Sequence, residues 1–139
     1  ALGDGPGGVL LIDDSYNANI DSMRAAVAAL EAIGKGRRTI AVLSEMLELG
    51  EDSPATHRAV GAMLSGAGVD ALIGLGRDAH YYSEGAASVP DRVLVEDPGA
   101  ALAAVLDRLT DDCVVLVKGS YNSYSWQVAD GLLEEATTR

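Results

Sequence analysis

The sequence predicts an α/β fold, built on a doubly wound, mainly parallel sheet of about five to six strands with helices on both faces. Short apolar runs alternate with helical patterns along the chain, and the length of 139 residues fits one domain. None of the runs shows the inside–outside alternation of a half-exposed strand. Strands that are apolar throughout are typical of parallel sheets covered by helices, and their alternation with helices favours right-handed crossovers.

Each expected element follows from a local pattern. The apolar runs that predict strands are residues 9–12, 39–43, 71–73, 93–95 and 113–117. Apolar residues at helical spacing predict helices over residues 23–33, 60–67, 79–86, 102–109 and 126–136. Pro54 and Pro98 stand near helix starts, where a missing N–H has little cost. The glycine-rich residues 1–8 are expected to be a linker, and residues 9–139 to be the domain.

Composition excludes several classes of function. The chain has 21 acidic and 10 basic residues, and its net charge of −11 would repel nucleic acids and anionic membranes. We therefore expect no nucleic-acid partner and no membrane insertion. The single cysteine, Cys113, can form no internal disulfide, which favours a reducing, cytoplasmic location.

The corner after the first expected strand is unusually polar. It contains Asp13, Asp14, Tyr16, Asn17 and Asn19, just before a helical pattern begins. An Asx-turn and a helix cap would explain about two of these side chains. Ligands bind at the carboxyl ends of strands in open parallel sheets, so this corner is the first candidate for a binding site.

The other strand ends meet at the same edge of a parallel sheet. Ser44 and Glu45 follow the second strand, and Lys118, Gly119 and Ser120 follow the last. Lys118 is either a surface cap or a clamp for an anion, because the helix start beside it would present free N–H groups. No segment matches the P-loop, so if ATP is used, another domain must hold its phosphates.

A second hypothesis comes from the third strand end. The segment from Gly74 to Ala79 fits the G-x-G-x-x-A dinucleotide pattern, and Glu96 lies twenty residues beyond Gly76, where a ribose-binding acid is expected. That motif normally follows the first strand, however, and two glycines at a tight turn are common without a ligand. His57 has no nearby His or Cys, so we expect no metal site and no acyl-enzyme chemistry.

Together these segments resemble the C-terminal domain of the Mur ligases, from about the first strand to the last helix. The matching motifs are Asp14-Ser15-Tyr16-Asn17-Ala18-Asn19, Asp21-Ser22-Met23-Arg24, Glu45-Met46-Leu47-Glu48-Leu49-Gly50, His57, Val60-Gly61, Gly74-Leu75-Gly76 and Leu116-Val117-Lys118-Gly119-Ser120. The likeness is greatest to members that join D-alanyl-D-alanine to UDP-N-acetylmuramoyl-tripeptide.

The resemblance implies a Rossmann-like third domain that closes over a central P-loop ATPase domain and a domain for the UDP-linked substrate. In the family, ATP converts a peptide carboxylate into an acyl phosphate, the incoming amine attacks, and a tetrahedral intermediate loses phosphate. ATP and Mg would be bound mainly by the absent central domain, so the isolated chain is expected to be inactive. Residues 1–8 would then be the linker from that domain.

The resemblance also implies roles for single residues. Asp14, Tyr16, Asn17 and Asn19 would bind the nucleotide, with Asp14 at the ribose. The catalytic residue would be Lys118, which would bind substrate together with Ser120, Glu45 and His57. No chemistry is assigned to Glu45 or His57.

Three positions depart from the family pattern. Ile20 replaces a common proline, Ser44 replaces a glycine, and Tyr121 replaces a frequent arginine, which puts dipeptide recognition in doubt. Two alternatives therefore stay open beside the ligase domain: a stand-alone dinucleotide-binding module and a non-catalytic interaction domain.

Overall fold

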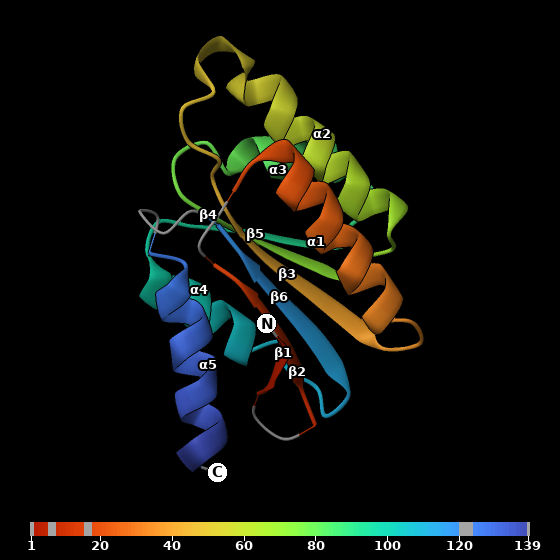
Figure 1. Cartoon of the computed structure of the whole chain (residues 1–139), viewed down its shortest axis with the longest axis vertical. Helices are drawn as coiled ribbons and strands as arrows, with labels where there is room; N and C mark the ends of the chain where they lie inside the picture. Colours follow the sequence, from red (N-terminus) through yellow and green to blue (C-terminus); the bar gives the residue numbers. More distant parts are fainter. Residues whose placement is uncertain (1, 6–7, 16–17, 120–123, 139) are drawn as a thin grey trace.

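The structure is a computed structural model that describes residues 2–5, 8–15, 18–119 and 124–138. A six-stranded sheet with the strand order β1-β2-β6-β3-β4-β5 lies between two layers of helices. Figure 1 shows α1, α2 and α3 over one face of this sheet and α4 and α5 over the other. The predicted doubly wound α/β fold is confirmed.

Five of the six strands run parallel, and all five coincide with the apolar runs of the sequence. The strands are β1 (Leu2–Asp4), β2 (Leu10–Asp14), β3 (Arg38–Ser44), β4 (Ala71–Leu75), β5 (Asp91–Val95) and β6 (Cys113–Lys118). β1 pairs antiparallel with β2. It lies within the residues 1–8 expected to be a linker, so part of that segment belongs to the sheet; its connection to another domain stays a prediction.

β5 differs from the expectation that every strand is covered on both faces. Arg92 and Leu94 are exposed, whereas Asp91, Val93 and Val95 are half-buried. β5 stands at the edge of the sheet, where helices cover one face better than the other. Three apolar residues were too few to reveal this alternation in the sequence.

The helices coincide with the expected apolar patterns, but α1, α2 and α4 begin three to seven residues earlier, α2 and α4 at the prolines expected near helix starts. They are α1 (Ile20–Ile33), α2 (Ser53–Gly66), α3 (His80–Gly85), α4 (Pro98–Leu106) and α5 (Trp126–Thr138), with a short 3₁₀ turn, η1 (Gly50–Asp52), before α2. Asn19 caps α1: its side chain accepts from Ser22 N, and the Ser22 hydroxyl accepts from Asn19 N. This capping box starts the helix at Ile20, where the resemblance implies a proline.

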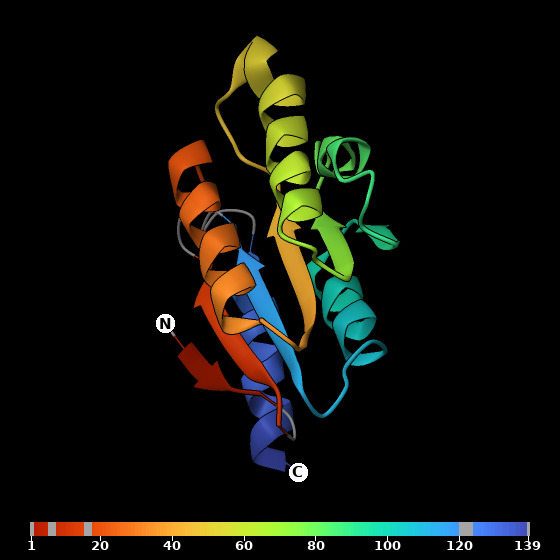
Figure 2. The ribbon, with the colours of Figure 1, turned by 90° about the vertical axis from the view of Figure 1, so that its right-hand side faces the viewer.

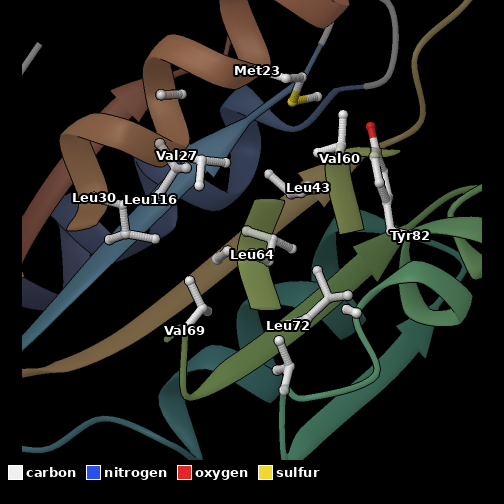
Figure 3. Close-up of a cluster of buried hydrophobic side chains, with 14 of the residues drawn as sticks. Met23, Val27, Leu30, Leu43, Val60, Leu64, Val69, Leu72, Tyr82 and Leu116 are labelled. Atoms are coloured by element: carbon white, nitrogen blue, oxygen red, sulfur yellow. The ribbon is translucent and has the colours of Figure 1, made fainter. Parts of the chain in front are cut away.

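Two separate hydrophobic clusters lie on the two faces of the sheet, because successive residues of a strand point to opposite sides. Figure 3 shows the cluster beneath α1, α2 and α3. It includes Met23, Val27, Leu30, Leu43, Val60, Leu64, Leu72, Tyr82 and Leu116. The cluster beneath α4 and α5 includes Leu11, Ile40, Val42, Ile73, Val105, Val115, Val117, Val128 and Leu132. Figure 2 shows the sheet between these layers.

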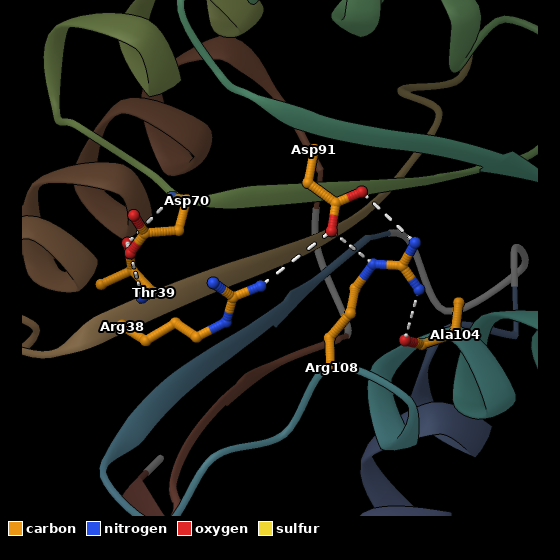
Figure 4. A network of polar contacts seen from close by, with 6 residues as sticks. All are labelled: Arg38, Thr39, Asp70, Asp91, Ala104 and Arg108. Carbon is orange, nitrogen blue, oxygen red and sulfur yellow. Dashed lines mark hydrogen bonds and ion pairs between the residues drawn. The ribbon is translucent and has the colours of Figure 1, made fainter.

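A polar network holds the amino ends of the strands together (Figure 4). Arg108 makes a two-pronged contact with Asp91, at 2.8 Å from Nε and 3.3 Å from Nη2, and Arg38 lies 4.0 Å from the same carboxylate. Asp70 accepts from Thr39 N at 2.9 Å. These contacts fix β3, β4 and β5 at the edge opposite the candidate site, so they support the scaffold from a distance.

Candidate functional site at the carboxyl ends of the strands

The carboxyl ends of β2 and β6 bring together an acid and a base that are 104 positions apart in the sequence. Asp14 and Lys118 are register partners, and Asp14 Oδ2 lies 2.9 Å from Lys118 Nζ. The Lys118 side chain is 0% exposed, whereas that of Asp14 is 42% exposed. The expectation that strand ends would unite these two residues is confirmed. Their roles toward a ligand stay predictions.

The Lys118 ammonium is a costly group in this position, because burial removes its hydration. Asp14 supplies a compensating charge from one side. No well-aligned hydrogen-bond acceptor for Nζ occurs among the residues that the structure describes. An ammonium has three N–H donors, so Lys118 is suited to an additional anionic partner.

The rest of the polar corner after β2 is partly structural. Ser15 is fully buried and its hydroxyl donates to Asp13 Oδ1 at 2.6 Å. The Asn19 side chain caps α1, so it is one of the polar side chains that a helix cap explains. Tyr16 and Asn17, predicted to bind nucleotide, lie outside the described residues.

Lys118 is followed by a tightly packed backbone. A Cβ on Gly119 would overlap the Ser44 hydroxyl and lie 2.6 Å from Ser125 Oγ. The chain therefore accommodates a serine at position 44 because residue 119 is glycine. Ser125 is fully buried and its hydroxyl has no hydrogen-bond partner within the described ranges. Ser120 and Tyr121 lie outside those ranges.

Beyond β3, a buried histidine supports the loop of residues 45–49. His57 is 0% exposed, and its Nε2 accepts from Met46 N at 2.9 Å. Its Nδ1 lies 2.7 Å from the carbonyl oxygen of Ser53, so the proton belongs on Nδ1. Both ring nitrogens have partners inside the protein. This geometry favours a supporting role for His57 over the expected contact with substrate.

Two further contacts secure the same loop. The Tyr82 hydroxyl donates to the Ser44 carbonyl at 2.8 Å, and its ring packs 4.7 Å from that of His57. Burial and, to a smaller extent, the Glu45 carboxylate raise the pKa of Tyr82 far above its ordinary value. The Tyr82 phenol is therefore a neutral donor.

Glu45 joins this loop to the one after β4. Its Oε2 accepts from Asp78 N at 2.9 Å, and Asp78 Oδ2 accepts from the Ser53 hydroxyl at 2.8 Å. Although serine, histidine and aspartate occur together here, the serine proton goes to Asp78 and not to His57. Ser53 is therefore not arranged as an activated nucleophile.

Glu45 also bears on the dinucleotide hypothesis. Gly76 has φ +110, and a Cβ there would lie 2.9 Å from Glu45 Oε1. The Asp78 N–H, which a pyrophosphate would need, already donates to this carboxylate. A cavity of about 530 Å³ beside the corner is lined by Gly76, Arg77, His80, Leu94, Val95 and Glu96. A carboxylate of the chain itself thus occupies the position where a dinucleotide phosphate would bind, and this disfavours the dinucleotide module.

Sequence reasoning missed four contributors to this region. Tyr82 was expected only as a core residue, and Ser53, Asp78 and Ser125 were not singled out. The serine before Pro54 indicated a helix start, but nothing local indicated that its hydroxyl reaches a residue 25 positions away.

Among the described residues, no three or more His, Cys, Asp or Glu side chains come together as a metal site would require. No helix within that part of the chain is both long and apolar enough to cross a membrane.

Comparison with known proteins gives consistent results. A family model described as Mur ligase, glutamate ligase domain, matches residues 2–121. The UDP-N-acetylmuramoyl-tripeptide–D-alanyl-D-alanine ligase of Mycobacterium leprae is 37% identical over 150 residues, covering 95% of this chain and 29% of that protein. The ligase of the same name from Escherichia coli is 35% identical over 128 residues, covering 92% and 28%.

Among solved structures, the MurF ligase from Thermotoga maritima in complex with ADP matches with a TM-score of 0.78 and 25% identity. The match covers 99% of this chain and 31% of that one. The chain therefore spans less than a third of the length of each of these three ligases.

Proposed function

The chain belongs to the Mur ligase family, as its glutamate ligase domain, and we propose that it is the C-terminal closing domain of an ATP-dependent ligase. The ligase adds D-alanyl-D-alanine to UDP-N-acetylmuramoyl-tripeptide in peptidoglycan synthesis. Relatives that bear this activity in their names align with more than nine-tenths of the chain. The observation that carries the proposal is the buried Lys118 ammonium beside Asp14 at the edge where ligands bind in such sheets.

The chemistry needs a positive charge where negative charge develops. When the amine attacks the acyl phosphate, the carbonyl oxygen of the tetrahedral intermediate becomes anionic before phosphate leaves. A preorganised ammonium stabilises such charge with little rearrangement, and Lys118 is held in advance by Asp14. Ser120, next but one along the chain, is proposed to bind the substrate beside it.

The nucleotide role falls on the corner after β2. Asp14 keeps 42% of its side chain exposed while one oxygen holds Lys118, so it can accept from ribose hydroxyls. Tyr16, Asn17 and Asn19 are proposed to line the same corner. A relative solved in complex with ADP supports the use of ATP.

Other parts of the reaction are assigned outside this chain. It has no P-loop motif, so the ATP phosphates require the central domain. The described residues offer no cluster of three or more His, Cys, Asp or Glu side chains, and Mg²⁺ is proposed to be bound mainly by the central domain. Residues 1–8 are proposed to connect to that central domain, and the reaction to take place in the cytoplasm.

The test uses the full-length protein that contains this domain. We expect phosphate release from ATP that requires both UDP-N-acetylmuramoyl-tripeptide and D-alanyl-D-alanine. Lys118→Met should lower kcat by about 100-fold or more, the loss typical of removing one charge-stabilising group. Release that is independent of the dipeptide would overturn the proposal.

The isolated chain gives a complementary test. We expect it neither to hydrolyse ATP nor to bind NAD tightly. Turnover of ATP by these 139 residues would refute the division of labour between domains. Tight NAD binding abolished by Gly76→Val would instead favour the dinucleotide module.

A further inference from the structure

The buried contacts around His57 form a latch that determines the position of one loop at the candidate site. The loop of residues 45–49 starts directly after Ser44, whose hydroxyl packs against Gly119, the neighbour of Lys118. Leu43, one residue earlier, is the register partner of Lys118. The loop therefore borders the proposed catalytic lysine on the side away from Asp14.

The latch consists of four contacts, each from a different segment of the chain. Glu45 N donates to Leu75 O at 3.1 Å, and Met46 N donates to His57 Nε2 at 2.9 Å. Tyr82 donates to the Ser44 carbonyl, and Glu45 Oε2 accepts from Asp78 N. The loop and its junction with β3 are thus tied to β4, α2, α3 and the turn before α3.

The same loop contains one residue in an unfavourable backbone conformation. Glu48 has φ 64, a left-handed conformation that is unfavourable for a non-glycine residue. Met46 is buried, whereas the Leu47 and Glu48 side chains are exposed. Such local strain persists only where surrounding contacts over-determine the backbone, and it is typical of functional segments.

We propose that His57 is a positioning residue for the second half of the reaction, in which the amine of D-alanyl-D-alanine attacks the acyl phosphate. This inference rests on the proposed function. The Ser53 carbonyl fixes the proton on Nδ1, so Nε2 presents a lone pair to Met46 N–H. Without that acceptor the buried Met46 N–H has no hydrogen-bond partner, and the loop of residues 45–49 becomes less ordered. The loop must then be ordered again beside Lys118 when D-alanyl-D-alanine binds.

His57→Phe tests the proposal, because phenylalanine keeps an aromatic ring but has no acceptor. In the full-length ligase we expect kcat/KM for D-alanyl-D-alanine to fall about tenfold or more, while KM for ATP changes less than twofold. His57→Gln should recover most of the activity, since its Oε1 can accept from Met46 N.

A matched control separates positioning from a general loss of stability. Leu64→Ala truncates a buried side chain on the same helix, α2, seven residues after His57, and leaves the His57 hydrogen bond to Met46 N in place. Urea unfolding identifies conditions in which both variants stay folded. There Leu64→Ala should keep kcat/KM within twofold of the wild type. An equal loss in both variants would overturn the proposal.

Amide hydrogen exchange provides a readout that does not depend on catalysis. The Met46 amide should exchange slowly in the 139-residue chain and at least tenfold faster in His57→Phe. If His57→Phe does not fold, Ser53→Ala, which removes the hydroxyl bonded to Asp78, should raise the same exchange rate by a smaller factor. Unchanged Met46 exchange refutes the latch, whereas a wild-type ligase without activity refutes the proposed function alone.

Discussion

The ion pair between Asp14 and Lys118 predicts that its two partners are unequal for stability. In Asp14→Asn the lysine stays buried and loses its counter-charge. Two unit charges 2.9 Å apart interact by about 6 kcal/mol at an effective dielectric constant of 20. Asp14 is 42% exposed, so water screens part of this energy, and we expect a loss of about 2–4 kcal/mol.

Lys118→Met should have a much smaller cost. Methionine fills most of the same volume without charge, and the remaining Asp14 carboxylate is exposed enough to be hydrated. We expect the free energy of unfolding to fall by about 1 kcal/mol or less. In the double variant the loss from Asp14→Asn should largely disappear, which gives a coupling energy of about 2 kcal/mol.

Urea unfolding of the wild type, the two single variants and the double variant at pH 7 measures all four states of this cycle. The reasoning fails if Lys118→Met costs more than Asp14→Asn. It fails equally if the two losses simply add, because the ammonium would then not depend on this carboxylate.

Three further predictions concern packing and pH. Tyr82→Phe should lose about 1 kcal/mol at pH 8, where the hydroxyl donates to the Ser44 carbonyl. Because the pKa of Tyr82 is raised in the folded state, its hydroxyl contributes fully to the free energy of unfolding below about pH 10, and this contribution is lost as the pH rises further. The free energies of unfolding of wild type and variant, measured in urea, should therefore become equal at alkaline pH. Gly61→Ala should cost about 1–3 kcal/mol in thermal unfolding, because its Cβ would overlap the Tyr82 carbonyl. Gly66→Ala on the same helix meets no atom within 4 Å and should be neutral or stabilising. Gly119→Ala should lower the melting temperature and, in the full-length protein, the proposed ligase activity, since its Cβ would displace the Ser44 hydroxyl.

The fold was predictable because most of its strands and helices are indicated by patterns within short segments of the sequence. Each parallel strand coincides with a short apolar run, and Asn19 and the periodic apolar residues that follow it indicate α1. β1 was not predicted, because its three residues include a glycine and an aspartate. They form a strand only through their pairing with β2. The alternation in β5 was hidden because it depends on which face the neighbouring helices cover.

The candidate site was predictable only in outline. Parallel strands fix which ends converge, and this was enough to unite Asp14 with Lys118. The orientation of His57 was not accessible, because a polar residue near a helix start is usually exposed and its burial depends on α3. The contact between Glu45 and the loop after β4 joins residues 33 positions apart, and no spacing rule predicts it.

β1 covers the outer side of β2 along its apolar residues. In the part of the chain that the structure describes, β1 aligns with Leu10, Leu11 and Ile12. The apolar part of β2 is thereby shielded against unwanted pairing with a strand of another molecule.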